Sequence, residues 1–142
     1  ELPEPAAAVL DERLLKRFPH VVTEAERTRR AEAAMRDDDP EFFGELMNGS
    51  HGSLREDFEV SGPELDRLVS LARGAGALGA RLTGAGMGGC MVALCTPDRV
   101  DSVLEALRNG YFVDSPGGDP PPDLHQRLFV AIPSAGASVS RR

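Results

Sequence analysis

The first half of the chain places apolar residues at helical spacing between polar stretches. Thr23–Glu26 has the composition of a capping box, in which a threonine and a glutamate close the first turn of a helix. About a dozen Ala-, Glu- and Arg-rich residues follow it, as a helix would require. Asp39 is predicted to cap a second helix with Pro40 at its first position, where no amide is needed. The apolar stripe of that helix consists of Phe42, Phe43, Leu46 and Met47.

Two later segments indicate helices with one apolar face each. Ser61–Glu64 resembles a second capping box, and Gly74 and Gly76 are predicted to end the helix that follows. Thr96 and Pro97 begin the other helix, and Gly110 is predicted to end it. The two stripes are Leu65, Leu68, Val69 and Ala72, then Val100, Val103, Leu104 and Leu107. One apolar face is typical of a helix that lies on a sheet.

Three apolar runs, residues 79–83, 90–95 and 128–132, have the length and composition of strands. The proline- and glycine-rich residues 115–122 precede the third run and predict a surface loop. With 142 residues, the chain has the usual size of one domain.

Residues 84–89, between the first two strands, contain four glycines. Gly84, Gly86 and Gly89 match the G-x-G-x-x-G spacing, but a dinucleotide-binding turn leads into a long helix. Only six residues separate Gly89 from the helix start at Thr96, so that interpretation fails, and no G-K-[ST] sequence supports a Walker loop. A flexible hairpin connection and a nest of backbone amides for an anion remain. Because two residues suffice for a hairpin turn, the longer loop favours an approach to a ligand.

Composition excludes some classes of function. The 16 basic and 23 acidic residues give a net charge of −7, which argues against binding to nucleic acid. No apolar run reaches the roughly 18 residues of a membrane span, and no secretion signal is recognisable. Cys90 and Cys95 are an odd number of residues apart on one strand, so they are predicted to be unbridged, buried thiols of a cytosolic protein.

The remaining candidate groups are assigned structural roles. His20, His51 and His125 lack metal-ligand spacing and are expected at the surface or in caps. The acidic residues 37–39 are assigned to the helix cap at Asp39 rather than to a metal. Arg27, Arg29 and Arg30 are expected on a solvated helix face.

Several stretches resemble the galactokinases of the GHMP small-molecule kinase family. Thr83–Cys90, TGAGMGGC, is similar to the third motif of that family. Residues 20–24 (HVVTE), 46–51 (LMNGSH), 53–55 (SLR), 60–61 (VS) and 63–66 (PELD) resemble a galactokinase run, and residues 129–137 its closing strand. The resemblance extends over residues 14–139. Met87 stands where the family usually has Phe, and Gly49 and Gly62 replace larger residues.

This resemblance implies an α+β, ferredoxin-like domain, with an antiparallel sheet and helices packed on one face. Residues 1–142 would form one domain at the C-terminal end of a longer cytoplasmic kinase that phosphorylates galactose at C1 with ATP and Mg²⁺. The loop expected beside the nucleotide phosphates comprises Thr83, Gly84, Ala85, Gly86, Met87, Gly88 and Gly89. The sugar-binding motif, the main phosphate loop and the catalytic Asp and Arg of the family belong to its N-terminal domain. No catalytic or metal-binding residue is therefore assigned here, and the isolated fragment is expected to be inactive.

Two alternatives remain at this point: a non-catalytic sugar- or nucleotide-sensing module of the same fold, and another GHMP sugar kinase. The family sheet has four strands where three are predicted, so a strand is expected before Glu1, and its absence would expose a sheet edge. Asn48, Ser50, His51 and Arg55 have no assigned role beyond helix-end capping and packing against the loop.

Overall fold

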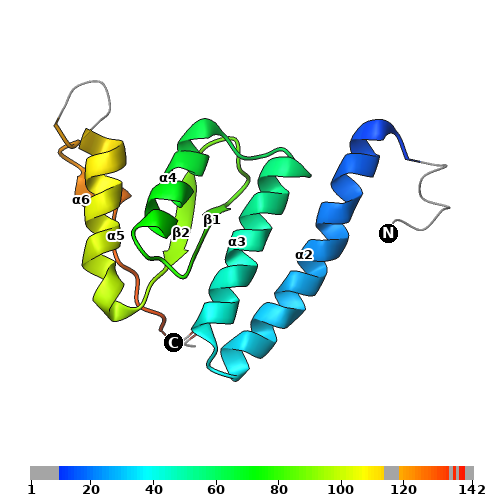
Figure 1. The fold of residues 1–142 in the computed structure, drawn as a ribbon, viewed down its shortest axis with the longest axis horizontal. Coiled ribbons are helices and arrows are strands. Elements are labelled where there is room, and N and C mark those ends of the chain that lie inside the picture. Colours follow the sequence, from blue (N-terminus) through cyan, green and yellow to red (C-terminus); the bar gives the residue numbers. More distant parts are fainter. Residues whose placement is uncertain (1–9, 114–118, 135, 137, 140–142) are drawn as a thin grey trace.

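The computed structural model describes residues 10–113, 119–134, 136 and 138–139. Its elements run from α2 to α6 in chain order (Figure 1). They are α2 (Glu12–Arg36), α3 (Pro40–Glu56), α4 (Pro63–Gly74), β1 (Gly79–Thr83), β2 (Cys90–Leu94), the 3₁₀ turn η1 (Pro97–Arg99), α5 (Val100–Leu107), the π-helical segment η2 (Arg108–Val113) and α6 (Leu124–Arg127).

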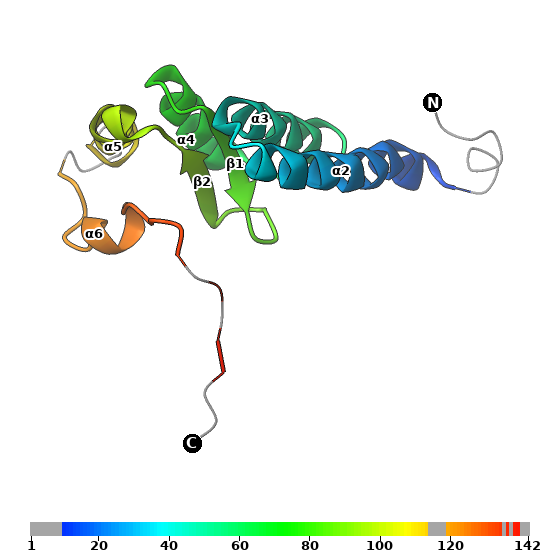
Figure 2. The ribbon, with the colours of Figure 1, turned by 90° about the horizontal axis from the view of Figure 1, so that it is seen from below.

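The described residues form the predicted α+β arrangement around one small sheet. β1 and β2 pair antiparallel, with Ala80 opposite Ala93 and Leu82 opposite Met91. Helices α3 and α4 lie on the same face of this hairpin, α2 packs beside α3, and α5 lies beside α4 (Figures 1 and 2). None of the helices in these residues is both long and apolar enough to cross a membrane.

The core joins the sheet to the helix stripes. One buried cluster contains Val69 and Ala72 of α4, Ala80 of β1, and Val103 and Leu107 of α5. A second cluster consists of Leu54, Leu65 and Leu82. Ala80 and Leu82 alternate along β1 as the inward face of a strand should, and full burial of a leucine contributes about 1.5–3 kcal/mol.

The start of α2 corrects the first capping-box prediction. The helix begins at Glu12, where Asp11 Oδ1 accepts the Leu14 amide at 2.8 Å. Thr23 lies inside α2 and donates its hydroxyl to the Pro19 carbonyl at 2.8 Å. A threonine followed by glutamate caps a helix only where the preceding residues are not helical, and here helix-forming residues extend upstream.

The other helix starts are partly as predicted. Asp39 caps α3 by accepting the Phe42 amide at 2.9 Å, with Pro40 at the first position. Helix α4 starts at Pro63, but its N-cap is Gly62, so Ser61 forms no capping box. The Ser61 hydroxyl instead donates to Asp66 Oδ1 at 2.6 Å.

The region around α5 also differs from the prediction. Pro97 opens the η1 turn, but Thr96 makes no side-chain cap. Gly110 does not end the helical region, which continues as η2 through Val113. A Cβ at Gly110 would lie 2.6 Å from Leu71 Cδ2, so this glycine allows close packing rather than a helix stop.

The third predicted strand is wrong: residues 128–132 are in no strand and pair with no other segment that the structure describes. Leu128 is half-buried against the first core cluster, but the residues after it are exposed, with Phe129 at 67% and Ile132 at 84%. Residues 115–118 of the predicted 115–122 loop lie outside the described part. Both cysteines are free, but Cys90 is exposed and Cys95 half-buried, so the prediction of two buried thiols is also wrong.

Candidate functional site

The glycine loop, residues 84–89, has a backbone that side chains rarely tolerate. The angle φ is positive at Gly84 (86°), Gly86 (80°), Gly88 (120°) and Gly89 (95°), and also at Met87 (59°). L-residues with a Cβ seldom adopt this region, so the loop shape requires its glycines.

One side of the loop is fixed to the segment between α3 and α4. The Met87 amide donates to the Val60 carbonyl at 2.7 Å. A Cβ on Gly86 would lie 2.3 Å from that same carbonyl oxygen, so the two backbones meet without room for a side chain. Val60 was not recognised from the sequence as part of the site.

The other side of the loop is open. A Cβ at Gly84, Gly88 or Gly89 would meet no atom within 4 Å, and both Ala85 and Met87 are exposed. Among the described residues, no group accepts a hydrogen bond from the amides of Ala85, Gly88 or Gly89. Successive free amides with positive φ form the kind of concave donor surface that binds anions.

β1, which leads into the loop, rests directly on α3. A Cβ at Gly79 would lie 2.3 Å from the Gly44 carbonyl oxygen, so helix and strand backbones are in contact. One turn later, Asn48 Oδ1 accepts the Ala80 amide at 3.0 Å and Asn48 Nδ2 donates to the Leu78 carbonyl at 3.1 Å. The strand is therefore held by a side-chain amide that reaches both a donor and an acceptor.

His51 contacts β1 one turn further along α3. Its Nδ1 lies 3.4 Å from the Leu82 amide, and because that amide can only donate, Nδ1 is unprotonated and Nε2 carries the proton. His51 Nε2 lies 3.3 Å from Asp66 Oδ1, but without hydrogen-bond geometry to any described residue. Burial lowers the pKa of His51, and the Asp66 carboxylate opposes this only in part.

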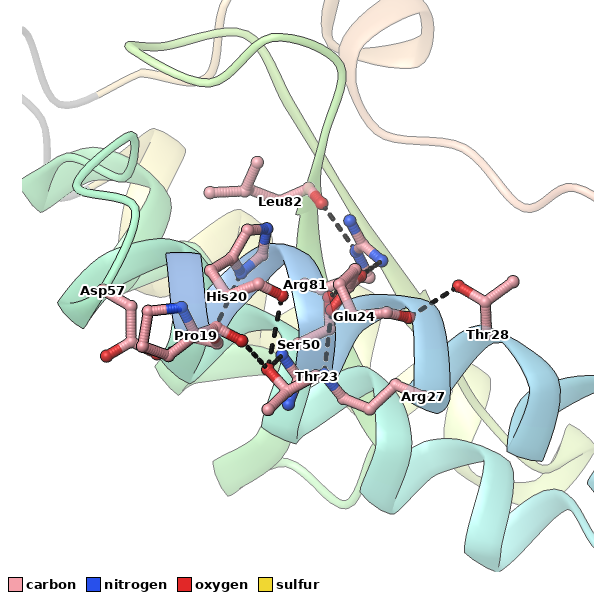
Figure 3. A network of polar contacts seen from close by, with 11 residues as sticks. Pro19, His20, Thr23, Glu24, Arg27, Thr28, Ser50, Asp57, Arg81 and Leu82 are labelled. Carbon is pink, nitrogen blue, oxygen red and sulfur yellow. Dashed lines mark hydrogen bonds and ion pairs between the residues drawn. The ribbon is translucent and has the colours of Figure 1, made fainter. Parts of the chain in front are cut away.

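A cluster of polar side chains around Glu24 connects α2, α3 and β1 (Figure 3). Glu24 Oε1 accepts from Ser50 Oγ at 2.5 Å and from Arg81 Nη1 at 3.0 Å, while Oε2 accepts from Arg27 Nε at 2.8 Å. Partial burial favours the neutral acid, but hydrogen bonds from Ser50 and Arg27 and the charge of Arg81 outweigh it. The pKa of Glu24 is therefore lowered. Glu24 is an ionised anchor between the three elements.

His20, Ser53 and Asp57 are the residue types of a hydrolytic triad, but they are not hydrogen-bonded in the order that a triad requires. Ser53 Oγ donates its single proton to Asp57 Oδ2 at 2.7 Å. His20 Nδ1, 2.9 Å from the same serine oxygen, must then be the donor, so the histidine cannot act as a base toward this serine. Both His20 and His51 are buried, which corrects their predicted surface or capping roles.

The structure shows where the four residues without an assigned role lie. Asn48, Ser50 and His51 lie inside α3 and bind β1 or α2, so none of them caps a helix end. Arg55 is near the end of α3 and pairs with Glu56 at 2.5 Å. The spacing of Gly44, Asn48 and His51 on one helical face was visible in the sequence, but the strand they contact was not.

Comparison with known proteins relates this arrangement to a family. The family model described as "GHMP kinases C terminal" matches residues 31–113, from the last six residues of α2 through η2. The galactokinase of Enterococcus faecalis is 50% identical over 106 residues, covering 74% of this chain and 27% of the relative. The galactokinase of Clostridium beijerinckii is 46% identical over 112 residues, covering 78% and 29%.

Solved structures of kinases are also similar to this chain. The Lactococcus lactis galactokinase complexed with galactose superposes with a TM-score of 0.68 and 47% identity, covering 72% of this chain and 27% of that one. The L. major mevalonate kinase in complex with R-mevalonate gives a TM-score of 0.57 and 32% identity, covering 61% and 26%. The chain spans about a quarter of the length of the relatives it matches. It therefore belongs to the GHMP kinases and corresponds to their C-terminal region.

Proposed function

We propose that this chain, residues 1–142, is the C-terminal domain of a galactokinase, which transfers the γ-phosphoryl group of ATP to the C1 hydroxyl of galactose. The observation that carries the proposal is the 50% identity to a galactokinase over 74% of the chain. The mevalonate kinase match has a lower identity, 32%, so it supports the shared fold more than a shared substrate.

The glycine loop is suited to border the phosphates of ATP. Its open side carries free amides, has no Cβ at three positions and lies on the surface. Residues 84–89 contain no Lys or Arg, so backbone donors would supply the contacts to phosphate oxygens. Phosphoryl transfer depends mainly on positioning and charge stabilisation, to which such donors contribute.

The remaining parts of the reaction fall outside this chain. ATP, when bound with Mg²⁺, supplies the transferable phosphoryl group, and no residue here is assigned to the metal. The sugar site, the main phosphate loop and the catalytic residues would belong to an N-terminal domain that packs against this one. Such a kinase would work in the cytoplasm, where ATP is available.

A chimeric enzyme tests the proposal. In the Enterococcus faecalis galactokinase, the region matched by this chain is replaced with the chain itself, and ADP release is measured with and without galactose. We expect galactose-dependent ADP release from the chimera and none from the 142-residue chain alone.

Mevalonate and a non-phosphorylatable sugar serve as substrate controls, and a cooperative thermal transition shows that the chimera is folded. A folded chimera without galactose-dependent turnover would contradict the proposal. Binding of galactose or ATP by the chain alone, with no turnover in the chimera, would instead favour a sensing module.

A further inference from the structure

We propose that Asn48 and His51 are positioning residues, which hold the outer edge of β1 as a neighbouring strand would and thereby orient the glycine loop. The geometry stands on its own, while the effect on catalysis rests on the proposed function above. Neither side chain hydrogen-bonds to residues 84–89, so both act through β1.

The directions of the β1 amides distinguish the outer edge of this strand from the edge that pairs with β2. In an antiparallel pair, successive residues alternate between facing the partner strand and facing away from it. The Ala80 and Leu82 amides bond to α3 side chains, so they are the outward-facing ones, and those of Arg81 and Thr83 face β2. The outer edge of β1 would otherwise present unpaired amides.

Asn48 fills the place of a peptide group from another strand. Its side-chain oxygen accepts a hydrogen bond from the Ala80 amide at 3.0 Å, and its side-chain nitrogen donates one to the Leu78 carbonyl at 3.1 Å. A side-chain amide has the same donor and acceptor as a backbone peptide, so this contact fixes β1 both along and across its direction. Leucine at this position would fill the space but satisfy neither group.

His51 extends the contact to the end of β1. Positions 44, 48 and 51 lie on one face of α3 and meet residues 79, 80 and 82 of β1 in the same order. One residue, Thr83, separates this last contact from the glycine loop. The direction in which the chain enters the loop is therefore set by α3.

His51 also faces the second anchor of the loop. Its Nε2 lies 3.3 Å from Asp66 Oδ1, which accepts the Ser61 hydroxyl at 2.6 Å. Ser61 follows Val60, whose carbonyl holds the Met87 amide. His51 thus contacts β1, which leads into the loop, and lies beside Asp66, which bonds to the segment that holds the other side of the loop.

The kinetic test uses the chimeric enzyme with Asn48→Leu and His51→Phe. We expect each to raise the KM for ATP about tenfold, the scale of one lost hydrogen bond, with the KM for galactose unchanged. His51→Gln, which keeps an acceptor near the Leu82 amide, should recover most of the wild-type KM for ATP.

Ser53→Ala is the matched control, because Ser53 is buried on the same helix and hydrogen-bonded, but bonds to His20 and Asp57 rather than to β1. It should lower the melting temperature without a selective change in the KM for ATP. If Asn48→Leu changes both KM values alike, or if Ser53→Ala has the same kinetic effect, the positioning role is overturned.

Amide hydrogen exchange in the 142-residue chain gives a readout that does not depend on activity. In Asn48→Leu the Ala80 amide should exchange at least about tenfold faster than in the wild type, and in His51→Phe the Leu82 amide should do so. The Arg81 amide, which faces β2, should keep its rate. Unchanged exchange at Ala80 and Leu82 would refute the inference, whereas an inactive wild-type chimera would refute only the proposed function.

Discussion

Gly86 is the residue at which the glycine loop tolerates a side chain least. Its φ is 80°, and a Cβ would lie 2.3 Å from the Val60 carbonyl oxygen, a backbone atom with little freedom to move. The loop is therefore fixed at this point by the absence of a side chain rather than by the presence of one.

We expect Gly86→Ala to lower the free energy of unfolding by about 1–3 kcal/mol, because it adds both backbone strain and a contact that is too close. Gly52→Ala is the matched control: Gly52 lies inside α3 and a Cβ there meets nothing within 4 Å. Alanine should stabilise that helix by about 0.5–1 kcal/mol. Urea unfolding of both variants checks the prediction. Equal changes in the free energy of unfolding would show that the backbone at Val60 moves to accommodate the added methyl group at little cost.

The two buried histidines, His20 and His51, should make the free energy of unfolding depend on pH. Burial lowers the pKa of both His20 and His51 below 6.5, so the unfolded chain binds their protons first as the pH falls. Their contribution is complete at pH values well above 6.5 and is lost progressively as the pH falls through that value.

The free energy of unfolding should therefore decrease from about pH 7.5 to about pH 5.5, and His51→Gln should show a shallower decrease because it lacks one of the two groups. Urea titrations at several pH values measure both slopes. Equal slopes in the two proteins would mean that His51 titrates in the folded state as it does in the unfolded one.

Among the elements, α2 is connected to the sheet chiefly through the Glu24 carboxylate. This group accepts from Ser50 of α3 and Arg81 of β1, and its side chain is 24% exposed. Glu26, two residues further on, pairs with Arg29 on the surface, with 58% of its side chain exposed.

We expect Glu24→Gln to lower the free energy of unfolding by about 1–3 kcal/mol, because the partly buried Arg81 loses its charged acceptor. Glu26→Gln, the same chemical change on the same helix, should cost less than about 0.5 kcal/mol. Urea unfolding compares the two. A similar small effect of both would mean that α2 is held by apolar packing alone.

The elements differ in how far the sequence could predict them. The stripes of α3, α4 and α5 and both strands of the hairpin depend on local periodicity, and they are found where predicted. The capping box at Thr23 fails because a capping motif is meaningful only if the preceding chain is not helical, which local sequence leaves open. The one at Ser61 fails because α4 starts one residue later, with Gly62 as its N-cap, and the Ser61 hydroxyl bonds to Asp66 instead.

The same limit applies to the site. The glycine run and its likeness to a kinase motif are visible in the sequence. The support by Asn48 and His51 is not, because β1 lies about 30 residues further along the chain and its outward amides are defined only once it pairs with β2. The prediction that the loop borders nucleotide phosphates remains a prediction.

At the scale of the whole molecule, residues 129–132 of the segment 128–132 lie exposed, although Leu128 packs against the core. Phe129, Val130 and Ile132 are 67%, 55% and 84% exposed. A run of exposed apolar residues that pairs with no strand is a site of association between chains.

We expect the isolated chain to self-associate, and Phe129→Glu with Ile132→Glu to reduce that association. Val21→Glu with Met35→Glu is the control, because it removes two exposed apolar side chains of α2 and changes the net charge equally. Sedimentation velocity over a range of concentrations measures both. If the control lowers association as much, added charge rather than the 128–132 segment is responsible.

The closed outer edge of β1 also limits how chains could join by strand pairing. Its outward amides already bond to Asn48 and His51, whereas no described segment pairs with the outer edge of β2. Two copies could meet through their β2 edges, but a third would find no edge left to extend. Assembly by strand addition would stop at a dimer instead of growing into a fibre.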